Sequence, residues 1–153
     1  MKIISKSLAG TEKFAADFVK NLQPKKDEAT LVALSGELGS GKTTFVQCVA
    51  RSLGVKENIT SPTFVLIKNY QLPATNHKLL YHIDAYRLER GEELAKLGFE
   101  EIVAEPNNLI FLEWPENVAE VLPKDYLTIK FSFIDEATRA IEFSTSNPQP
   151  RFV

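Results

Sequence analysis

The sequence predicts an α/β fold: a single-domain, three-layer sandwich in which helices flank a mixed, mostly parallel sheet. Three observations predict it. Two short runs, residues 31–34 and 109–112, are apolar at every position, as expected of strands buried on both faces. Helical patterns alternate with the strand patterns along the chain. The length of 153 residues, 44% of them hydrophobic, suits one compact domain with an ordinary core.

The amino-terminal part reads as helix, strand, loop and helix. We expect the first helix over residues 11–22, because hydrophobic residues recur there every four positions and Thr11 is a suitable capping residue. The buried strand over residues 31–34 follows. A glycine-bearing loop then leads into a second helix over residues 42–53, which Gly54 is expected to end.

The middle of the chain predicts a hairpin and a weaker helix. Residues 64–70 and 79–84 have strand-like composition, and the polar segment between them contains a proline and an asparagine, which favour a turn. Residues 92–102 have a helical pattern that Gly98 interrupts. We therefore expect two paired strands followed by a helix broken near that glycine.

The last third predicts three further strands and a tail. The apolar run at residues 109–112 is followed by Glu113, and apolar residues alternate with polar ones over residues 127–133. Residues 140–143 are expected to pair with that alternating strand. Residues 1–143 then form the domain, and residues 144–153, with two prolines and little apolar content, form a loose carboxy-terminal tail.

The glycine-bearing loop carries the most specific signal in the sequence. Gly36-Glu37-Leu38-Gly39-Ser40-Gly41-Lys42-Thr43 fits the pattern G-x-x-x-x-G-K-[ST], the P-loop, and it lies between a buried strand and an amphipathic helix. Glycines let the backbone approach phosphates closely, and successive N–H groups can surround an anion. A lysine at this place spans the β- and γ-phosphate oxygens, and the threonine hydroxyl coordinates Mg²⁺. The expected fold is therefore of the P-loop NTPase type.

A P-loop enzyme also needs a carboxylate at a strand end to hold Mg²⁺ or to orient the attacking water. Two residues are candidates. Glu113 follows the apolar run at residues 109–112, and Asp84 follows the less uniform run at residues 79–83. Either one is also compatible with a solvated carboxylate where a strand leaves the sheet.

Absent motifs narrow the class of enzyme. The chain has no Asn-Lys-x-Asp, the usual guanine-reading motif of small GTPases, so ATP is favoured over GTP. Small-molecule kinases usually close an arginine-bearing lid over the phosphates, whereas this chain has five scattered arginines and no long insertion. Hydrolysis is therefore favoured over transfer to a metabolite. A kinase acting on a small molecule and a nucleotide-sensing module that does not hydrolyse ATP remain as alternatives.

Composition and charge argue against several other classes of protein. With 18 Lys+Arg against 20 Asp+Glu the net charge is −2, which argues against a protein that grips DNA or tRNA mainly through phosphates. One cysteine, Cys48, excludes an internal disulfide framework and a multi-cysteine zinc site. No run reaches the roughly 18 apolar residues of a membrane-spanning helix, and the first residues do not resemble a secretory signal. We expect a cytoplasmic protein without a membrane partner.

Four segments in order resemble the signatures of the TsaE (formerly YjeE) family, the small bacterial ATPases of the tRNA threonylcarbamoyladenosine pathway. They are the P-loop extended through Thr44-Phe45, then Thr60-Ser61-Pro62-Thr63-Phe64, then His82-Ile83-Asp84-Ala85-Tyr86-Arg87-Leu88, and then Glu113-Trp114-Pro115-Glu116. The resemblance implies a weak, partner-dependent ATPase that needs ATP and Mg²⁺. It implies action with the TsaB and TsaD proteins, which modify an adenosine beside the anticodon, with tRNA reached through that complex.

The resemblance also implies roles for individual residues. Lys42, Asp84 and Glu113 would be catalytic, and Thr43 with Glu113 would hold Mg²⁺. Thr63 would lie in a segment that responds to the γ-phosphate. The residues implied to bind the nucleotide are Thr11 and Arg139, flanking the base and ribose, and Leu38, Gly39, Ser40, Gly41, Lys42, Thr43 and Thr44 along the phosphates.

Overall fold

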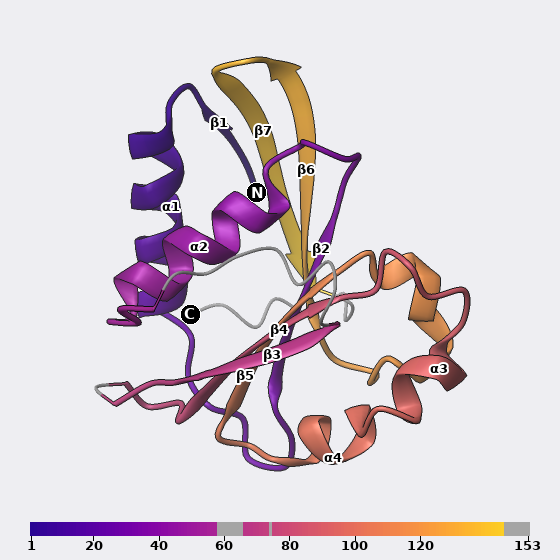
Figure 1. Cartoon of the computed structure of the whole chain (residues 1–153). Helices are drawn as coiled ribbons and strands as arrows, with labels where there is room; N and C mark the ends of the chain where they lie inside the picture. The colour runs from indigo at the N-terminus through magenta and orange to yellow at the C-terminus, as the bar shows by residue number, and fades with distance from the viewer. Residues whose placement is uncertain (58–65, 74, 146–153) are drawn as a thin grey trace.

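A computed structural model of the chain describes residues 1–57, 66–73 and 75–145. Strands and helices alternate along most of this length (Figure 1). In chain order the elements are β1 (Lys2–Ser5), α1 (Leu8–Lys20), β2 (Thr30–Ser35), α2 (Lys42–Ser52), β3 (Ile67–Gln71), β4 (Leu79–Asp84), α3 (Gly91–Ala95), α4 (Phe99–Ala104), β5 (Asn108–Glu113), the 3₁₀ segment η1 (Pro115–Val121), β6 (Leu127–Asp135) and β7 (Thr138–Thr145).

The strands form one mixed sheet in the order β1-β7-β6-β2-β5-β4-β3. Its centre is parallel: β2 pairs with β5 and β6, and β5 pairs with β4. Its margins are antiparallel, where β3 pairs with β4 and β7 pairs with both β6 and β1. The expected α/β sandwich with a mixed sheet is confirmed. In the central parallel strands, carboxyl ends meet at one edge of the sheet.

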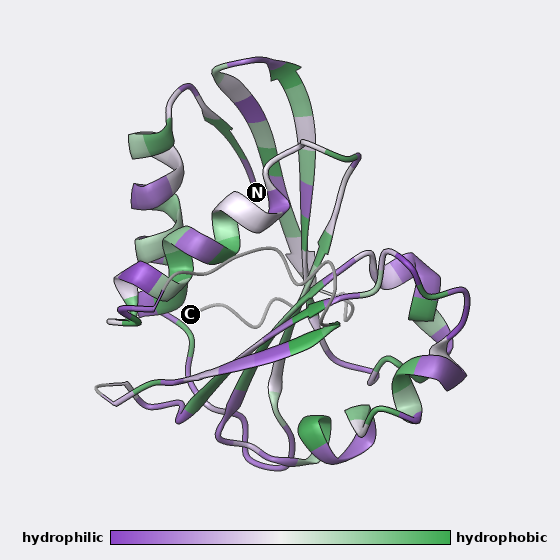
Figure 2. Ribbon diagram, in the orientation of Figure 1, coloured by the Kyte–Doolittle hydropathy of each residue, from purple (hydrophilic) through white to green (hydrophobic). Residues whose placement is uncertain are grey.

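Helices cover the two faces of the sheet separately. Helices α1 and α2 lie on one face, and α3, α4 and η1 lie on the other (Figure 1). Because side chains alternate along a strand, neighbouring residues of β2 enter different cores: Leu31 packs with the α3–α4 layer, and Val32 packs with the α1–α2 layer. Figure 2 shows the corresponding hydrophobic colouring along the central strands.

Several boundaries differ from the sequence expectations. Helix α1 begins at Leu8, and Ser7 caps it by accepting a hydrogen bond from the Gly10 N–H at 3.1 Å, so the expected cap at Thr11 is wrong. Ser7 is the cap because its backbone is extended, whereas Thr11 lies inside the helix. The interruption expected at Gly98 is confirmed, since this residue separates α3 from α4 with a φ of 92°.

The first and last strands of the chain also differ from the sequence expectations. Strand β1 was not expected from the sequence. Strand β7 continues to Thr145, so Ser144 and Thr145 pair with β6 instead of starting the tail. Residues 146–153 lie outside the described residues, as do residues 64 and 65 of the strand expected over residues 64–70.

Candidate nucleotide and magnesium site

The loop between β2 and α2 depends on glycine at Gly36. Its φ is 142°, and a Cβ there would lie 2.5 Å from the Phe131 carbonyl oxygen and 2.7 Å from the Ser40 hydroxyl. Gly39, with a φ of 76°, also adopts a conformation that other residues rarely occupy, but a Cβ there would meet no atom within 4 Å. The loop is therefore closely packed at its base and open at its tip.

The loop ends at the start of α2, where no side chain caps the helix. Gly41, with a φ of 109°, is the residue before the helix and has no side chain to offer. The first N–H groups of a helix lack acceptors within the helix and carry its positive dipole end. This helix start therefore suits an anion such as a phosphate.

Lys42 is buried beside this helix start. Its ammonium donates to the carbonyl oxygen of Gly36 and, at 3.4 Å, to that of Glu37, and it lies 3.8 Å from the centre of the Trp114 ring. Burial lowers the pKa of Lys42, while the nearby carboxylates, Glu113 first among them, act in the opposite direction. The side chain is thus a desolvated cation held over the loop.

Thr43 and Glu113 face each other from α2 and the end of β5. The Thr43 hydroxyl lies 3.1 Å from Oε1 and 3.0 Å from Oε2 of Glu113. Thr43 is the residue after Lys42, so a hydroxyl and a carboxylate lie in contact next to the lysine of the loop. Hydroxyl and carboxylate oxygens are the donor types that Mg²⁺ prefers.

Asp84 occupies the end of β4, directly opposite Glu113 in the parallel pairing. Its Oδ1 accepts a hydrogen bond from the Tyr86 N–H at 3.0 Å. Burial is the main cause that raises the pKa of Asp84, and the charge of Glu113 adds to it. The Tyr86 hydrogen bond, His82 and Lys42 oppose this rise. The two carboxylates expected from the sequence are thus neighbours at one sheet edge.

His82 is a buried neighbour of Glu113 to which the sequence alone assigns no role. Its Nε2 lies 2.6 Å from Glu113 Oε2, and none of its side chain is exposed. No local pattern connects this histidine with Glu113, because their contact depends on the register between β4 and β5. In that register His82 is opposite Phe111, two residues before Glu113.

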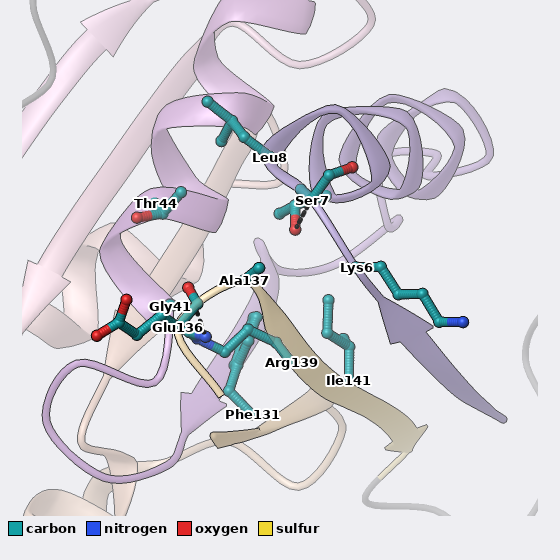
Figure 3. A pocket seen from close by; sticks show the side chains of 11 residues that line it. Lys6, Ser7, Leu8, Gly41, Thr44, Phe131, Glu136, Ala137, Arg139 and Ile141 are labelled. Carbon is teal, nitrogen blue, oxygen red and sulfur yellow. Dashed lines mark hydrogen bonds between the residues drawn. The ribbon is translucent and has the colours of Figure 1, made fainter. Parts of the chain in front are cut away.

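A cavity of about 310 Å³ adjoins the loop and the start of α2. Figure 3 shows Arg139 reaching toward Gly41 from β7, with Thr44 on α2 and with Ser7 and Leu8 at the start of α1. Thr11 also lines this cavity. Arg139 further contacts the Gly39 carbonyl oxygen at 3.5 Å and lies 4.6 Å from the Phe133 ring. Residues expected to flank a base and ribose are thus gathered beside the loop.

The remaining loop residues differ in exposure. Leu38 is 68% exposed at the loop tip. Ser40 is buried, and its hydroxyl has no hydrogen-bond partner in the part of the chain that the structure describes. Thr63, expected to respond to the γ-phosphate, lies outside the described residues.

The oxygen atoms of Thr43 and Glu113 suit a Mg²⁺ ion that is also bound by phosphates of the substrate. Among residues 1–57, 66–73 and 75–145, no group of three or more His, Cys, Asp or Glu side chains is arranged to hold a metal ion. Mg²⁺ usually keeps several waters and takes one or two protein oxygens together with substrate phosphates. Thr43 and Glu113 beside an anion-binding helix start match that requirement.

Among residues 1–57, 66–73 and 75–145, no helix is both long and apolar enough to cross a bilayer.

Comparisons with known proteins agree with one another. Residues 5–141 match the model of a family described as threonylcarbamoyl adenosine biosynthesis protein TsaE. A Rickettsia typhi protein named tRNA threonylcarbamoyladenosine biosynthesis protein TsaE is 36% identical over 138 residues, which is 90% of each chain. A Treponema pallidum protein of the same name is 36% identical over 92% of this chain and 98% of its own.

A solved structure is also similar to this one. The crystal structure of Bacillus subtilis YdiB superposes with a TM-score of 0.77 at 26% identity, covering 96% of this chain and 86% of YdiB. The likeness therefore extends over nearly the whole sheet and its helices.

Proposed function

This chain belongs to the TsaE family and so has a role in tRNA threonylcarbamoyladenosine biosynthesis, and on that premise we propose that it is the ATP-binding and hydrolysing subunit of the pathway. In this proposal it acts with the TsaB and TsaD proteins, which transfer threonylcarbamoyl to an adenosine beside the anticodon of tRNA. ATP hydrolysis resets that complex between turnovers. The chain is a weak ATPase by itself and meets tRNA through its partners in the cytoplasm.

One observation carries the proposal: the Thr43 hydroxyl contacts both carboxylate oxygens of Glu113 beside the phosphate loop. These two residues would hold Mg²⁺, which supplies charge neutralisation at the phosphate oxygens when bound. Lys42 offers its ammonium to the β- and γ-phosphate oxygens in exchange for the loop carbonyls that it contacts.

In this proposal Asp84 orients the attacking water. In hydrolysis a water oxygen forms a bond to the γ-phosphorus, the bond from that phosphorus to the bridging oxygen breaks, and ADP leaves with the electron pair. One proton of the water passes to the Asp84 carboxylate and from there to the phosphate product or to solvent. Burial raises the pKa of Asp84, which makes its carboxylate a better proton acceptor than an exposed aspartate.

The cavity beside the loop supports a nucleoside as the rest of the ligand. Thr11 and Arg139 would flank the base and ribose, and Thr44 and Gly41 line the same space. The backbone of residues 38–43 would surround the phosphates.

Measurement of ADP release tests the proposal. The purified chain is assayed alone and with TsaB and TsaD, and threonylcarbamoyl modification of tRNA is followed in parallel. We expect slow release alone, faster release with the partners, and loss of modification when this chain is omitted.

Other outcomes would replace the proposal. Release of ADP only in the presence of a small-molecule acceptor would identify a kinase. Nucleotide binding without any ADP release, with or without partners, would identify a sensing module.

A further inference from the structure

The histidine on β4 is buried against a charged group of the site. His82 is completely buried, yet its polar contact is with the carboxylate of Glu113 and not with a backbone carbonyl. Burial of a carboxylate costs free energy unless its oxygens accept hydrogen bonds. The contact between Nε2 and Oε2 is 2.6 Å long, so the ring is in direct hydrogen-bonding reach of the carboxylate.

Two donors from different elements fix the Glu113 side chain. Thr43 on α2 contacts both carboxylate oxygens, and His82 on β4 contacts Oε2. Thr43 is expected to turn toward Mg²⁺ when the ion binds. Among the described residues, the side chain of His82 has no other hydrogen-bond partner that competes with Glu113. Its Nδ1 is buried with no partner in those ranges.

We propose that His82 is a positioning residue for the magnesium-binding carboxylate of Glu113: the ring donates Nε2–H to Oε2 and so would hold the carboxylate in place and leave Oε1 available to the metal. This inference rests on the proposed function, because it assigns to His82 a role at the magnesium site. His82 touches neither nucleotide nor metal in this role.

The proposed role requires the ring to carry its proton on Nε2, because an ionised carboxylate oxygen accepts and does not donate. In that tautomer Nδ1 is an acceptor without a proton, and unpaired buried acceptors are more common in proteins than unpaired buried N–H groups. Partners of metal-binding carboxylates and histidines typically alter metal affinity by about 10- to 100-fold when removed.

Two substitutions of matched chemistry separate positioning from packing. His82→Gln keeps an N–H donor at about the reach of Nε2, and His82→Asn has the same amide one methylene shorter. Mn²⁺ is titrated into each protein with adenylyl imidodiphosphate, and free Mn²⁺ is read by electron paramagnetic resonance. Nucleotide affinity is measured separately in EDTA.

We expect His82→Asn to weaken Mn²⁺ binding by about 10- to 100-fold, His82→Gln to restore it to within about threefold of the natural chain, and affinity in EDTA to change little. Equal Mn²⁺ affinity in the natural chain and both variants would overturn the inference while leaving the proposed function intact. Absence of Mn²⁺ binding in the natural chain would overturn both.

A second measurement needs no variant. Long-range ¹H–¹⁵N correlation spectra of the histidine-labelled natural chain report which ring nitrogen of His82 is protonated. A protonated Nε2 supports the inference, whether or not His82→Asn folds. An unprotonated Nε2 could not donate to Glu113 and would overturn it.

Discussion

Asp84 and Glu113 are direct partners in the parallel pairing of β4 with β5. Both side chains lie on the sheet face covered by α1 and α2, since each falls in alternation with core residues of that face, Leu80 on β4 and Phe111 on β5. Two buried carboxylates at adjacent strand ends repel each other, and the charge of Glu113 contributes to the raised pKa of Asp84. A cation between the loop and this pair would relieve the repulsion.

The first prediction concerns turnover. Asp84→Asn keeps an oxygen that can accept from the Tyr86 N–H but removes the carboxylate proposed to orient water. We expect ATP turnover to fall by about 100-fold or more, in the range of a lost general base, while ATP affinity changes little. Single-turnover assays and calorimetry measure the two quantities. Unchanged turnover would remove Asp84 from the mechanism.

The second prediction concerns stability and pH. Because burial raises the pKa of Asp84, its ionised form is less favourable in the folded chain than in the unfolded one. The destabilisation is absent below the ordinary aspartate pKa and develops as the pH rises through the raised value. We expect Asp84→Asn to be more stable than the natural chain at neutral pH, and the difference to vanish in acid. Denaturant unfolding at several pH values measures this, and a pH-independent difference would contradict it.

The third prediction separates metal binding from nucleotide binding. Glu113→Gln preserves the size of the side chain but removes the charge that Mg²⁺ favours. We expect Mg²⁺-dependent ATP affinity to fall by about tenfold or more, corresponding to a charged interaction of roughly 1.5–3 kcal/mol, with affinity in EDTA nearly unchanged. Glu105, an exposed residue at the end of α4, provides a control as Glu105→Gln. Equal losses with and without Mg²⁺ would argue against a metal role.

The fourth prediction compares two glycines with the same backbone strain. Gly39 and Gly54 have φ values of 76° and 87°, and a Cβ would meet no atom within 4 Å at either. Alanine at each is expected to destabilise the fold by about 1–2 kcal/mol. Gly39→Ala should in addition weaken nucleotide binding, because its Cβ would enter the space proposed for phosphates. Equal nucleotide affinity in the two variants would contradict a phosphate position at the loop tip.

Much of the fold was predictable because its signals are local. The apolar runs of β2 and β5 and the glycines that end or interrupt helices each act within a few residues. Strand β1 gave no such signal, since it is an edge strand of four residues that exists through its pairing with β7. The cap of α1 was misassigned because Ser7 and Thr11 both suit a helix start, and only the extended backbone of Ser7 decides between them.

The residues of the candidate site could be predicted from the sequence where they belong to one contiguous motif or directly follow a strand. Residues 36–43 are contiguous, and Glu113 and Asp84 follow recognisable strands. The relation of His82 to Glu113 depends on the register between β4 and β5, which local patterns do not determine. The contact of Lys42 with the Trp114 ring likewise depends on the backbone of Trp114, whose φ is 61°. A residue other than glycine rarely adopts a positive φ, so the sequence does not predict this conformation.

Calorimetric titration with ATP and Mg²⁺ tests the central claim most directly. The account predicts that the natural chain binds one equivalent of Mg²⁺–ATP and that Lys42→Ala, which removes the buried ammonium, loses about tenfold or more in affinity. Lys13→Ala, an exposed change on α1, is the control and should bind as the natural chain does. Absence of heat with the natural chain, or equal binding by Lys42→Ala, would contradict the account.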